Sequence, residues 1–407
     1  MSNPSKHHQK AKAFPARVAR RRRRDRTLVS ITVLLIAAAW IIGYYTSGVN
    51  AAPQVAELLP EADHIEKQGD LFVGYNEDKT EILGYAATGK APGYSGPIQV
   101  LVGMDPAGNV IGVKVLKQSE TPGFFRLVVN ADIVSQFVGR TFDAPFQLGD
   151  DIDAVSGATL SAEGVAAAAR QAIRNIAQDG LEKPLPAEQR SIQFGGPEIS
   201  LLALFAAGYI GHKMRAGAWK RRIRWGIMLA GILFIGFVYT VPLTITMIIS
   251  LLSGYWPDWQ ANLYWYILIG GILFVTSVDG KNPYCGWFCP FGAVQETLAA
   301  VTDAKRYRPK ELRGLLTWLQ RGLALLAILL GLALRRPGVA GYEPFAVLFD
   351  FQGMTVEWVF LAVILLGSLL VYRPFCTYLC PIDPTVALIA AIRRWGRDVW
   401  RSWRRTR

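Results

Sequence analysis

All four cysteines of this chain lie in two copies of one short pattern, and each copy directly follows a long apolar stretch. The copies, which we call the first and second cysteine box, are Cys285-Gly-Trp-Phe-Cys289-Pro290 and Cys376-Thr-Tyr-Leu-Cys380-Pro381. Cysteines four residues apart share one face of a helix, which suits two bonds to one metal centre better than a disulfide. The proline that follows disfavours helix at the preceding cysteine, so each box is predicted to mark a helix end.

Together the two boxes offer four thiolates, the ligand number of iron–sulfur clusters and of structural zinc sites. We therefore predict Cys285, Cys289, Cys376 and Cys380 as ligands of one centre, with an iron–sulfur cluster favoured over zinc. Unreactive buried thiols are the remaining alternative, and two pairs at identical spacing argue against it. The spacing does not distinguish [2Fe–2S] from [4Fe–4S].

The charge distribution indicates a membrane protein. Hydrophobic residues make up 51% of the chain, mean hydropathy is +0.24 and the net charge is +13. Residues 51–200 hold 11 basic and 20 acidic side chains, whereas the basic runs 1–27, 213–224 and 393–407 flank apolar stretches. That is the positive-inside pattern of a polytopic membrane protein, and it argues against a nucleic-acid partner.

Six apolar stretches are candidates for crossing a bilayer, which takes about 20 helical residues. They are Leu28–Tyr45, Ile199–Gly211, Trp225–Leu252 (with a kink expected at Pro242), Asn262–Val278, Leu315–Leu334 and Val356–Tyr372. With six crossings, both termini, the basic loop 213–224 and both cysteine boxes face the cytoplasm of a bacterial inner membrane. The acidic segment and the loops Ser253–Ala261 and Arg335–Thr355 then face outward.

The predicted domain order follows from these spans. Residues 1–27 form a basic, disordered cytoplasmic tail and 28–46 a membrane anchor, with a signal peptide cleaved near Ala51-Ala52 as the alternative. Residues 65–180 form an extracytoplasmic α+β domain, 181–197 a linker, and 198–383 the membrane domain. Residues 384–407 form a basic amphipathic helix suited to anionic lipid.

Within the acidic domain, Ile98–Met104 and Val110–Leu116 flank Asp105-Pro-Ala-Gly108, whose residues suit a type I turn, so we expect a β-hairpin. An Ala-rich helix is predicted from Ser161, as N-cap, to Gln178. The motif Asp153-Ala-Val-Ser156-Gly157-Ala158-Thr159 comes just before it. Thr159 thus lies where unpaired backbone N–H groups favour a phosphate, and Gly157 and Ala158 allow a ligand to approach closely. A plain turn and helix cap would have the same local sequence.

The motif resembles the flavinylation sequence of domains that carry FMN in a phosphoester bond to threonine, found in sodium-translocating quinone reductases and Rnf-type complexes. The stretches Gly93-Tyr-Ser-Gly96 and Glu120-Thr121-Pro-Gly123 are similar to that family in the same order. The resemblance implies that Thr159 carries the FMN, that Asp153 assists the flavin transferase, and that the Glu120–Gly123 turn lies against the flavin. Glu120 and Thr121 could equally be ordinary turn residues.

A flavin domain outside followed by membrane spans and two cysteine boxes resembles the NosR/NirI family, and the shorter proteins associated with reductive dehalogenases in particular. The family's further ferredoxin-like domain has no counterpart before Arg407. The resemblance implies a polytopic α-helical membrane protein with about six transmembrane helices and an extracytoplasmic α+β FMN-binding domain. It would transfer electrons between a cytoplasmic, ferredoxin-type or quinol donor and an extracytoplasmic reductase.

A regulatory or maturation role for such a reductase is the second reading of the same resemblance. No side chain stands out as a catalytic acid, base or nucleophile. One difficulty accompanies the electron-transfer reading: cysteine boxes at the cytoplasmic face and a flavin outside would be separated by roughly 30 Å of hydrocarbon.

Overall fold

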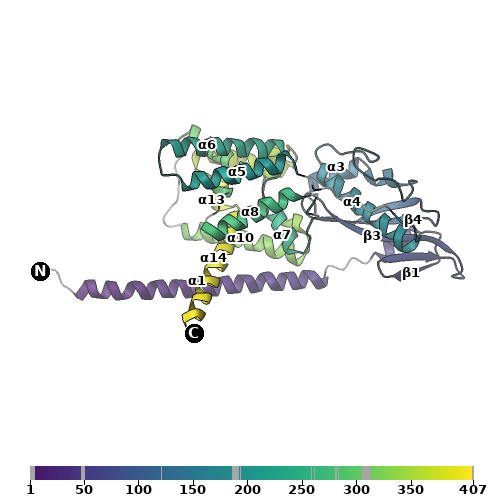
Figure 1. Ribbon diagram of the computed structural model, residues 1–407, viewed down its shortest axis with the longest axis horizontal. Coiled ribbons are helices and arrows are strands. Elements are labelled where there is room, and N and C mark those ends of the chain that lie inside the picture. Colours follow the sequence, from purple (N-terminus) through teal and green to yellow (C-terminus); the bar gives the residue numbers. More distant parts are fainter. Residues whose placement is uncertain are drawn as a thin grey trace.

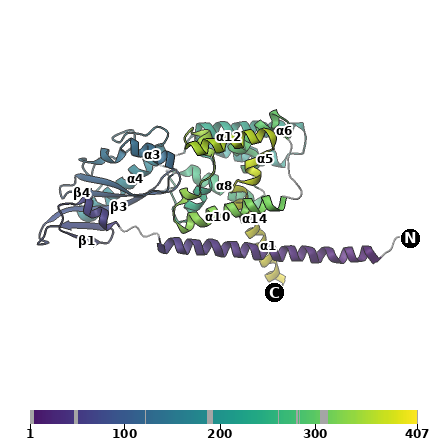
Figure 2. The ribbon, with the colours of Figure 1, turned by 180° about the vertical axis from the view of Figure 1, so that it is seen from behind.

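The computed structural model of the protein consists of a sheet domain and a helical bundle joined end to end (Figure 1). It describes residues 5–46, 51–120, 122–185, 192, 194–257, 259–260, 262–279, 282, 284–304 and 313–405. The long helix α1, Ser5–Thr46, runs along one side of the bundle, and its free end points away from the sheet domain (Figure 2).

The sheet domain is an antiparallel meander in which every strand pairs with its neighbours in sequence. Its strands are β1 His64–Gln68, β2 Leu71–Tyr75, β3 Ile82–Pro92, β4 Pro97–Met104 and β5 Val110–Lys117, in the order β1-β2-β3-β4-β5. The predicted hairpin is confirmed, since β4 pairs with β5 and the N–H of Gly108 donates to the carbonyl oxygen of Asp105 at 3.0 Å. The short helices of the domain are α2 Ala52–Leu58, α3 Pro122–Asn130 and the 3₁₀ turn η1 Ile133–Phe137.

Helix α4, Thr159–Asn175, covers the sheet and continues as a π-helical turn, η2 Ile176–Gly180. Small residues allow this helix to approach the strands closely, because a Cβ on Gly89 of β3 would overlap the backbone of Ala168. The predicted N-cap is wrong: α4 begins two residues earlier, at Thr159, with Ala158 as its N-cap. Ser161 lies inside the helix, where its hydroxyl bonds to Glu120 instead.

The bundle is built from helices of very different lengths. Its elements are α5 Gly196–Lys213, α6 Ala218–Gly231, η3 Ile232–Val238, α7 Ile245–Leu252, α8 Leu263–Asp279, η4 Tyr284–Phe288, α9 Pro290–Val301, α10 Arg313–Ala333, η5 Pro337–Ala340, α11 Phe345–Phe349, α12 Thr355–Leu370, α13 Pro374–Tyr378 and α14 Ile382–Arg405. Among the described residues, Arg23–Thr46 and Gly314–Ala333 are both long and apolar enough to cross a bilayer. Leu263–Val278 and Thr355–Leu370 are apolar but shorter.

The predicted span Trp225–Leu252 is wrong as a single kinked helix. Helix α6 and its π-helical continuation end at Val238, and α7 starts only at Ile245, with Thr244 accepting a hydrogen bond from the N–H of Met247 as its N-cap. Pro242 lies in the gap, where it lacks the N–H that a continuous helix needs. The break is therefore complete, and α7 packs as a separate short helix.

The N-terminal tail, which the sequence predicted as disordered, is helical from Ser5 onward and forms one helix with the apolar segment that follows it. Its Lys, Arg and Ala residues are strong helix formers. The apolar part of α1 packs against α10: a Cβ on Gly43 would overlap the carbonyl oxygen of Leu332.

The sheet domain docks closely on the bundle through backbone contacts. A Cβ on Gly338 of η5 would overlap the carbonyl oxygen of Ser119, and one on Gly96 would lie 3.4 Å from the ring of Pro337. The hydroxyl of Ser250 in α7 donates to the carbonyl oxygen of Ser95 at 3.3 Å. The loop Arg335–Thr355 packs between the two parts and buries Phe345, Val347 and Phe349.

Candidate functional site

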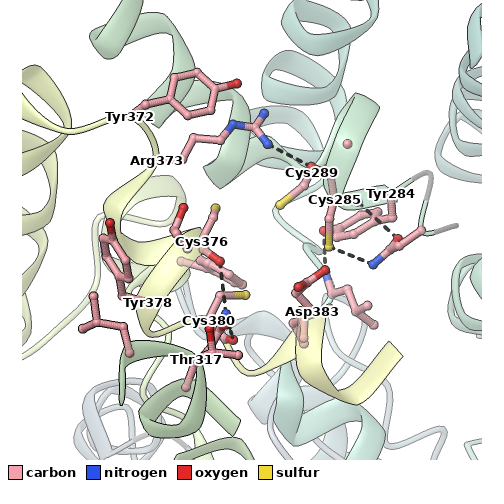
Figure 3. Close-up of a pocket in the computed structure, with 18 of the residues that line it drawn as sticks. Tyr284, Cys285, Cys289, Thr317, Tyr372, Arg373, Cys376, Tyr378, Cys380 and Asp383 are labelled. Carbon is pink, nitrogen blue, oxygen red and sulfur yellow. Dashed lines mark hydrogen bonds between the residues drawn. The ribbon is translucent and has the colours of Figure 1, made fainter. Parts of the chain in front are cut away.

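The two cysteine boxes face each other across one cavity of about 640 Å³. Cys285 and Cys289 lie on one side, and Cys376 and Cys380 on the other (Figure 3). The wall also includes Tyr284, Gln320, Phe345, Arg373 and Asp383. Tertiary structure thus brings together all four residues that the sequence predicted as ligands, although 87 residues separate the pairs in the chain.

Both boxes have the same local backbone. The first cysteine of each lies in a short helix, η4 or α13, and the second lies at a break before the next helix, α9 or α14. In each break the N–H of the second cysteine donates five residues back at 2.8 Å, from Cys289 to Tyr284 and from Cys380 to Phe375. Cys289 has extended backbone angles and Pro290 opens α9, as the predicted helix end requires.

Amide side chains bond directly to two of the sulfur atoms. The Nδ2 of Asn282 lies 3.0 Å from the Sγ of Cys285, and the Nε2 of Gln295 lies 3.2 Å from the Sγ of Cys376. Gln320 donates to the carbonyl oxygens of Cys376 and Cys380 at 3.1 and 3.0 Å. Hydrogen bonds of this kind orient thiolate ligands and tune a cluster's reduction potential.

A buried ion network ties the first box to the second. Glu296 of α9 accepts from Arg224 at 2.7 Å and from Arg373 at 2.7 Å. Arg373 also donates to the carbonyl oxygen of Cys285 at 3.1 Å, and Arg224 to that of Gly286 at 3.3 Å. Two guanidinium groups against one carboxylate leave a positive charge beside the cavity, which stabilises anionic ligands.

Sequence reasoning missed these supporting residues. Arg224 was counted only as part of a basic loop, and Arg373 was not singled out. The one local signal is the pair Gln295–Glu296, two polar residues in the otherwise apolar start of α9. Their partners lie 72 to 81 residues away, so only the fold reveals what they contact.

The arrangement fits a cluster in chemical terms. Four thiols line one cavity. Four thiolates are the ligand set of an iron–sulfur cluster and also of a structural zinc site.

The flavin motif forms an exposed turn at the start of α4. Gly157 has φ +77°, a conformation that favours glycine. Asp153, Ser156 and Thr159 are exposed, Ala158 is buried, and the Thr159 hydroxyl donates to the carbonyl oxygen of Val155 at 3.3 Å. The first residue of the helix is therefore exposed at the surface of the domain.

Glu120 organises the neighbouring loop from a buried position. Its carboxylate accepts hydrogen bonds from the N–H groups of Tyr94, Ser95 and Gly96 at 3.1, 3.0 and 3.2 Å, and from the Ser161 hydroxyl. Burial raises the pKa of the Glu120 carboxyl above its ordinary value, while these donors favour the charged form. Glu120 is thus a loop anchor inside the domain.

The rest of the predicted flavin-facing turn lies at the border of the bundle. Thr121 lies outside the described residues. A Cβ on Gly123 would lie 3.9 Å from the backbone of Gly353, and one on Gly157 would lie 3.1 Å from the Nε2 of Gln352. The segment before α12 therefore packs against both parts of the predicted flavin site.

Phe345 connects this border to the cysteine cavity. Its ring lies 5.0 Å from that of Phe291, which follows Cys289-Pro290, and 6.2 Å from that of Phe375, which precedes Cys376. The same side chain also lines a second cavity that includes Tyr94 and Ser95 of the sheet domain. The loop 341–353 thus contacts both regions through Phe345.

Two family models match the chain, each over one of these regions. Residues 93–174 match an FMN-binding domain, and residues 261–309 and 355–399 match a 4Fe-4S binding domain. The first range includes Thr159 and the second contains all four cysteines. The class is therefore that of a flavoprotein with an iron–sulfur domain, and the matches support a role in electron transfer.

Relatives of both parts are found among known proteins. The chain is 25% identical to protein NirI of Paracoccus denitrificans over 48% of its own length and 30% of NirI. It is 25% identical to regulatory protein NosR of Pseudomonas aeruginosa over 50% of its length and 31% of NosR. It is 31% identical to a component of the ion-translocating oxidoreductase complex of Methanosarcina acetivorans, over 31% of its length and 72% of that component.

In both regions the chain matches the NosR/NirI family, and its FMN domain is similar to the ion-translocating oxidoreductase component. The matched region spans about a third of the NirI and NosR chains.

Proposed function

We propose that the protein is a membrane-bound electron-transfer flavoprotein that serves an oxidoreductase outside the cytoplasm. FMN is attached by a phosphoester to Thr159, and a [4Fe–4S] cluster is bound by Cys285, Cys289, Cys376 and Cys380. When bound, the two groups supply a carrier of one or two electrons and a carrier of one electron. The observation that carries this proposal is Phe345, whose side chain lines both the cysteine cavity and the cavity at the flavin domain.

The residues of the chain have distinct parts in this function. The four thiolates hold the cluster, and Asn282 and Gln295 donate to two of their sulfurs. The turn Asp153–Thr159 presents the attachment hydroxyl, and Ser156, Gly157 and Ala158 shape it for a flavin transferase. Glu120 and Gly123 keep the adjoining loops in place, and Thr121 is proposed to lie with them against the flavin.

The proposed topology has six crossings: α1, α5, α6 with η3, α8, α10 and α12. It places both termini and the basic residues of 213–224 in the cytoplasm of a bacterial inner membrane, and the FMN domain 65–180 outside. The domain limits are those expected from the sequence, with α14 lying on anionic lipid. The distribution of basic residues supports this orientation.

Chemical analysis of the purified protein tests both cofactors. The intact mass of the wild type should exceed the sequence mass by one FMN phosphoester, and Thr159→Ala should lose that increment. Ser135→Ala, which removes an exposed hydroxyl outside the motif, should keep it. An unmodified wild-type protein made together with a flavin transferase would contradict covalent attachment.

The cluster has its own test. Iron and acid-labile sulfide should be present at about four each per chain, as a [4Fe–4S] cluster requires, and should be lost in Cys376→Ser. Zinc without sulfide would contradict the proposal. The donor, a quinol or a ferredoxin-type protein, is identified by which of them reduces the flavin and cluster during turnover with the partner reductase.

A regulatory or maturation role is the second candidate, and it is favoured by the name of the relative from Pseudomonas aeruginosa, a regulatory protein. A regulator needs no sustained electron flow. Variants that keep both cofactors but exchange electrons slowly would then leave the partner reductase fully matured and active with an artificial donor. An electron carrier predicts loss of the reductase's activity with its physiological donor in the same variants.

A further inference from the structure

A second cavity of about 320 Å³ lies where the sheet domain, α7 and α12 meet. Tyr94 and Ser95 contribute from the sheet domain, Thr244 and Thr246 from the start of α7, and residues 341–347 from the inserted loop. Val356, Glu357 and Phe360 of α12 complete the wall. This volume is at the lower end of the roughly 300–1,000 Å³ of small-molecule sites.

The wall is mostly apolar, with a few polar groups. One is the carboxylate of Glu343, whose Oε1 accepts the N–H of Ile245 at 2.7 Å. Another is Thr246, whose hydroxyl lies 2.8 Å from that of Thr244. An apolar cavity with a few fixed hydrogen-bonding groups suits a flat ring that carries oxygen atoms.

The cavity borders an apolar outer surface. Val356 lines the cavity and is also 77% exposed on the outside of the protein. Val359, Val363, Leu366 and Leu370 follow it at helical spacing and are all exposed. On the proposed topology this stripe of α12 faces lipid, so a ligand could reach the cavity from the bilayer without crossing water.

The predicted flavin residues do not line this cavity. Gly353 lies between the cavity and the predicted flavin residues. A Cβ on it would lie 2.7 Å from Val347 and 2.9 Å from Glu357, which both line the cavity. On its other side lies Gly123 of the predicted flavin turn. Phe345 separates the cavity from the cysteines, so a ligand here would lie between the two proposed cofactors.

We propose that this cavity binds the ring of a membrane quinone, with the protonated carboxyl of Glu343 donating a hydrogen bond to a ring oxygen. The proposal rests on the proposed function, because it assigns the lipid-soluble donor or acceptor of the same electron-transfer protein. Quinones are the class of redox ligand that is carried in lipid, is flat, and bears oxygen atoms on an otherwise apolar ring. A water-soluble donor would not need an entrance on the lipid-facing stripe.

The test is a binding measurement on the full chain with both cofactors, reconstituted in lipid nanodiscs and titrated calorimetrically with decylubiquinone. The wild type should bind saturably at about one quinone per chain. Val356→Trp, which fills the entrance at an exposed position, should weaken binding at least about tenfold, as should Glu343→Leu, which removes the hydrogen-bond donor at a similar side-chain size. Val363→Trp, two turns along the same stripe and outside the cavity, is the matched control and should bind as the wild type does.

Absence of saturable binding to the cofactor-loaded wild type overturns the proposal, as does equal binding by the two Trp variants. If Val356→Trp does not fold, Glu343→Leu decides alone, and wild-type affinity in that variant overturns the assignment. A shifted flavin absorption band in Val356→Trp with unchanged quinone affinity would assign the cavity to the flavin ring instead. FMN, iron and sulfide contents are measured on the same samples, so failure of the quinone site is distinguished from failure of the proposed function.

Discussion

At the scale of single residues, the side chains around the cysteines do more than fill space. Gln295 joins the two boxes through one amide: its Nε2 donates to the sulfur of Cys376, and its Oε1 accepts the N–H of Phe375 at 3.0 Å. A residue of α9, directly after the first box, thereby fixes the second. The electronic and the structural roles of this amide can be separated by measurement.

Replacement of Gln295 by Leu should lower the midpoint potential of the cluster by an amount on the order of tens of millivolts. The reason is that an N–H donated to a sulfur ligand stabilises the more negative, reduced cluster. Redox titration followed by electron paramagnetic resonance measures the shift. Thr297→Val, on the same helix and with its hydroxyl bonded to the carbonyl oxygen of Ala293, should leave the potential unchanged. An unshifted potential in Gln295→Leu would show that this hydrogen bond has no electronic role.

Because the carboxyl of Glu343 is buried, we expect the stability of the folded protein to depend on pH. Its removal from bulk water raises the pKa of its carboxyl from about 4.5 to about 7. Between these values the folded state binds more protons than the unfolded state, so stability falls as pH rises through this range, by at most about 3 kcal/mol. Glu343→Gln cannot ionise and should therefore gain thermal stability over the wild type at pH 8 but not at pH 4.5. Melting curves of the detergent-solubilised proteins at both pH values provide the check, and a pH-independent difference would refute the assignment.

At the scale of elements, glycines decide how closely α6 approaches the first cysteine box. A Cβ on Gly231 would lie 2.5 Å from the carbonyl oxygen of Phe288, whereas one on Gly226 of the same helix would meet no atom within 4 Å. The π-helical turn η4 that carries Cys285 thus packs directly on the α6 backbone. Such irregular turns are frequent at functional sites.

Gly231→Ala should therefore push η4 away from α6 and reduce cluster occupancy by half or more, because Cys285 and Cys289 both move with that turn. Gly226→Ala should keep full occupancy, since its new methyl group has open space. Iron and sulfide per chain are the measured quantities, with the amount of folded protein determined by size-exclusion chromatography. Equal occupancy in the two variants would mean that the turn can shift without loss of the ligands.

At the scale of the whole molecule, the decisive feature is the contact between the FMN domain and the bundle. Backbone meets backbone where η5 touches the sheet domain, since a Cβ on Gly338 would overlap the carbonyl oxygen of Ser119. A side chain at position 338 would therefore push the sheet domain and the bundle apart. We expect electron exchange between the two proposed cofactors to depend on this fit.

Gly338→Ala should slow electron exchange between flavin and cluster severalfold, because the new methyl group would overlap the carbonyl oxygen of Ser119 and push the two parts away from each other. Both cofactors should remain bound, since neither set of ligands is touched. Gly322→Ala on α10, with no atom within 4 Å of the new methyl, is the matched control. Flash photoreduction followed at the flavin and cluster absorption bands gives the rate, and an unchanged rate in Gly338→Ala would contradict a role for this contact.

Local features of the fold could be predicted because they depend on neighbouring residues. The hairpin around Asp105–Gly108, the helix after the flavin motif and the breaks at Pro290 and Pro381 all follow from turn and proline chemistry. The predictions were wrong where a local preference competes with contacts to residues far away in the sequence. Ser161 bonds to Glu120, 41 residues away, in place of capping α4, and the Trp225–Leu252 stretch is interrupted to form α7 under the sheet domain.

The sequence by itself determined the chemistry of this protein: thiolates at helix breaks, a threonine hydroxyl at a helix start, and charged segments beside apolar ones. These are properties of short segments, whose backbone conformation and reactivity are set by adjacent residues. Only the tertiary structure decided that loop 341–353 enters the bundle, that Phe345 lies between the two cavities, and that Glu296 joins Arg224 to Arg373. Such contacts link residues far apart in the chain, and they are selected by the packing of the whole core rather than by any local pattern.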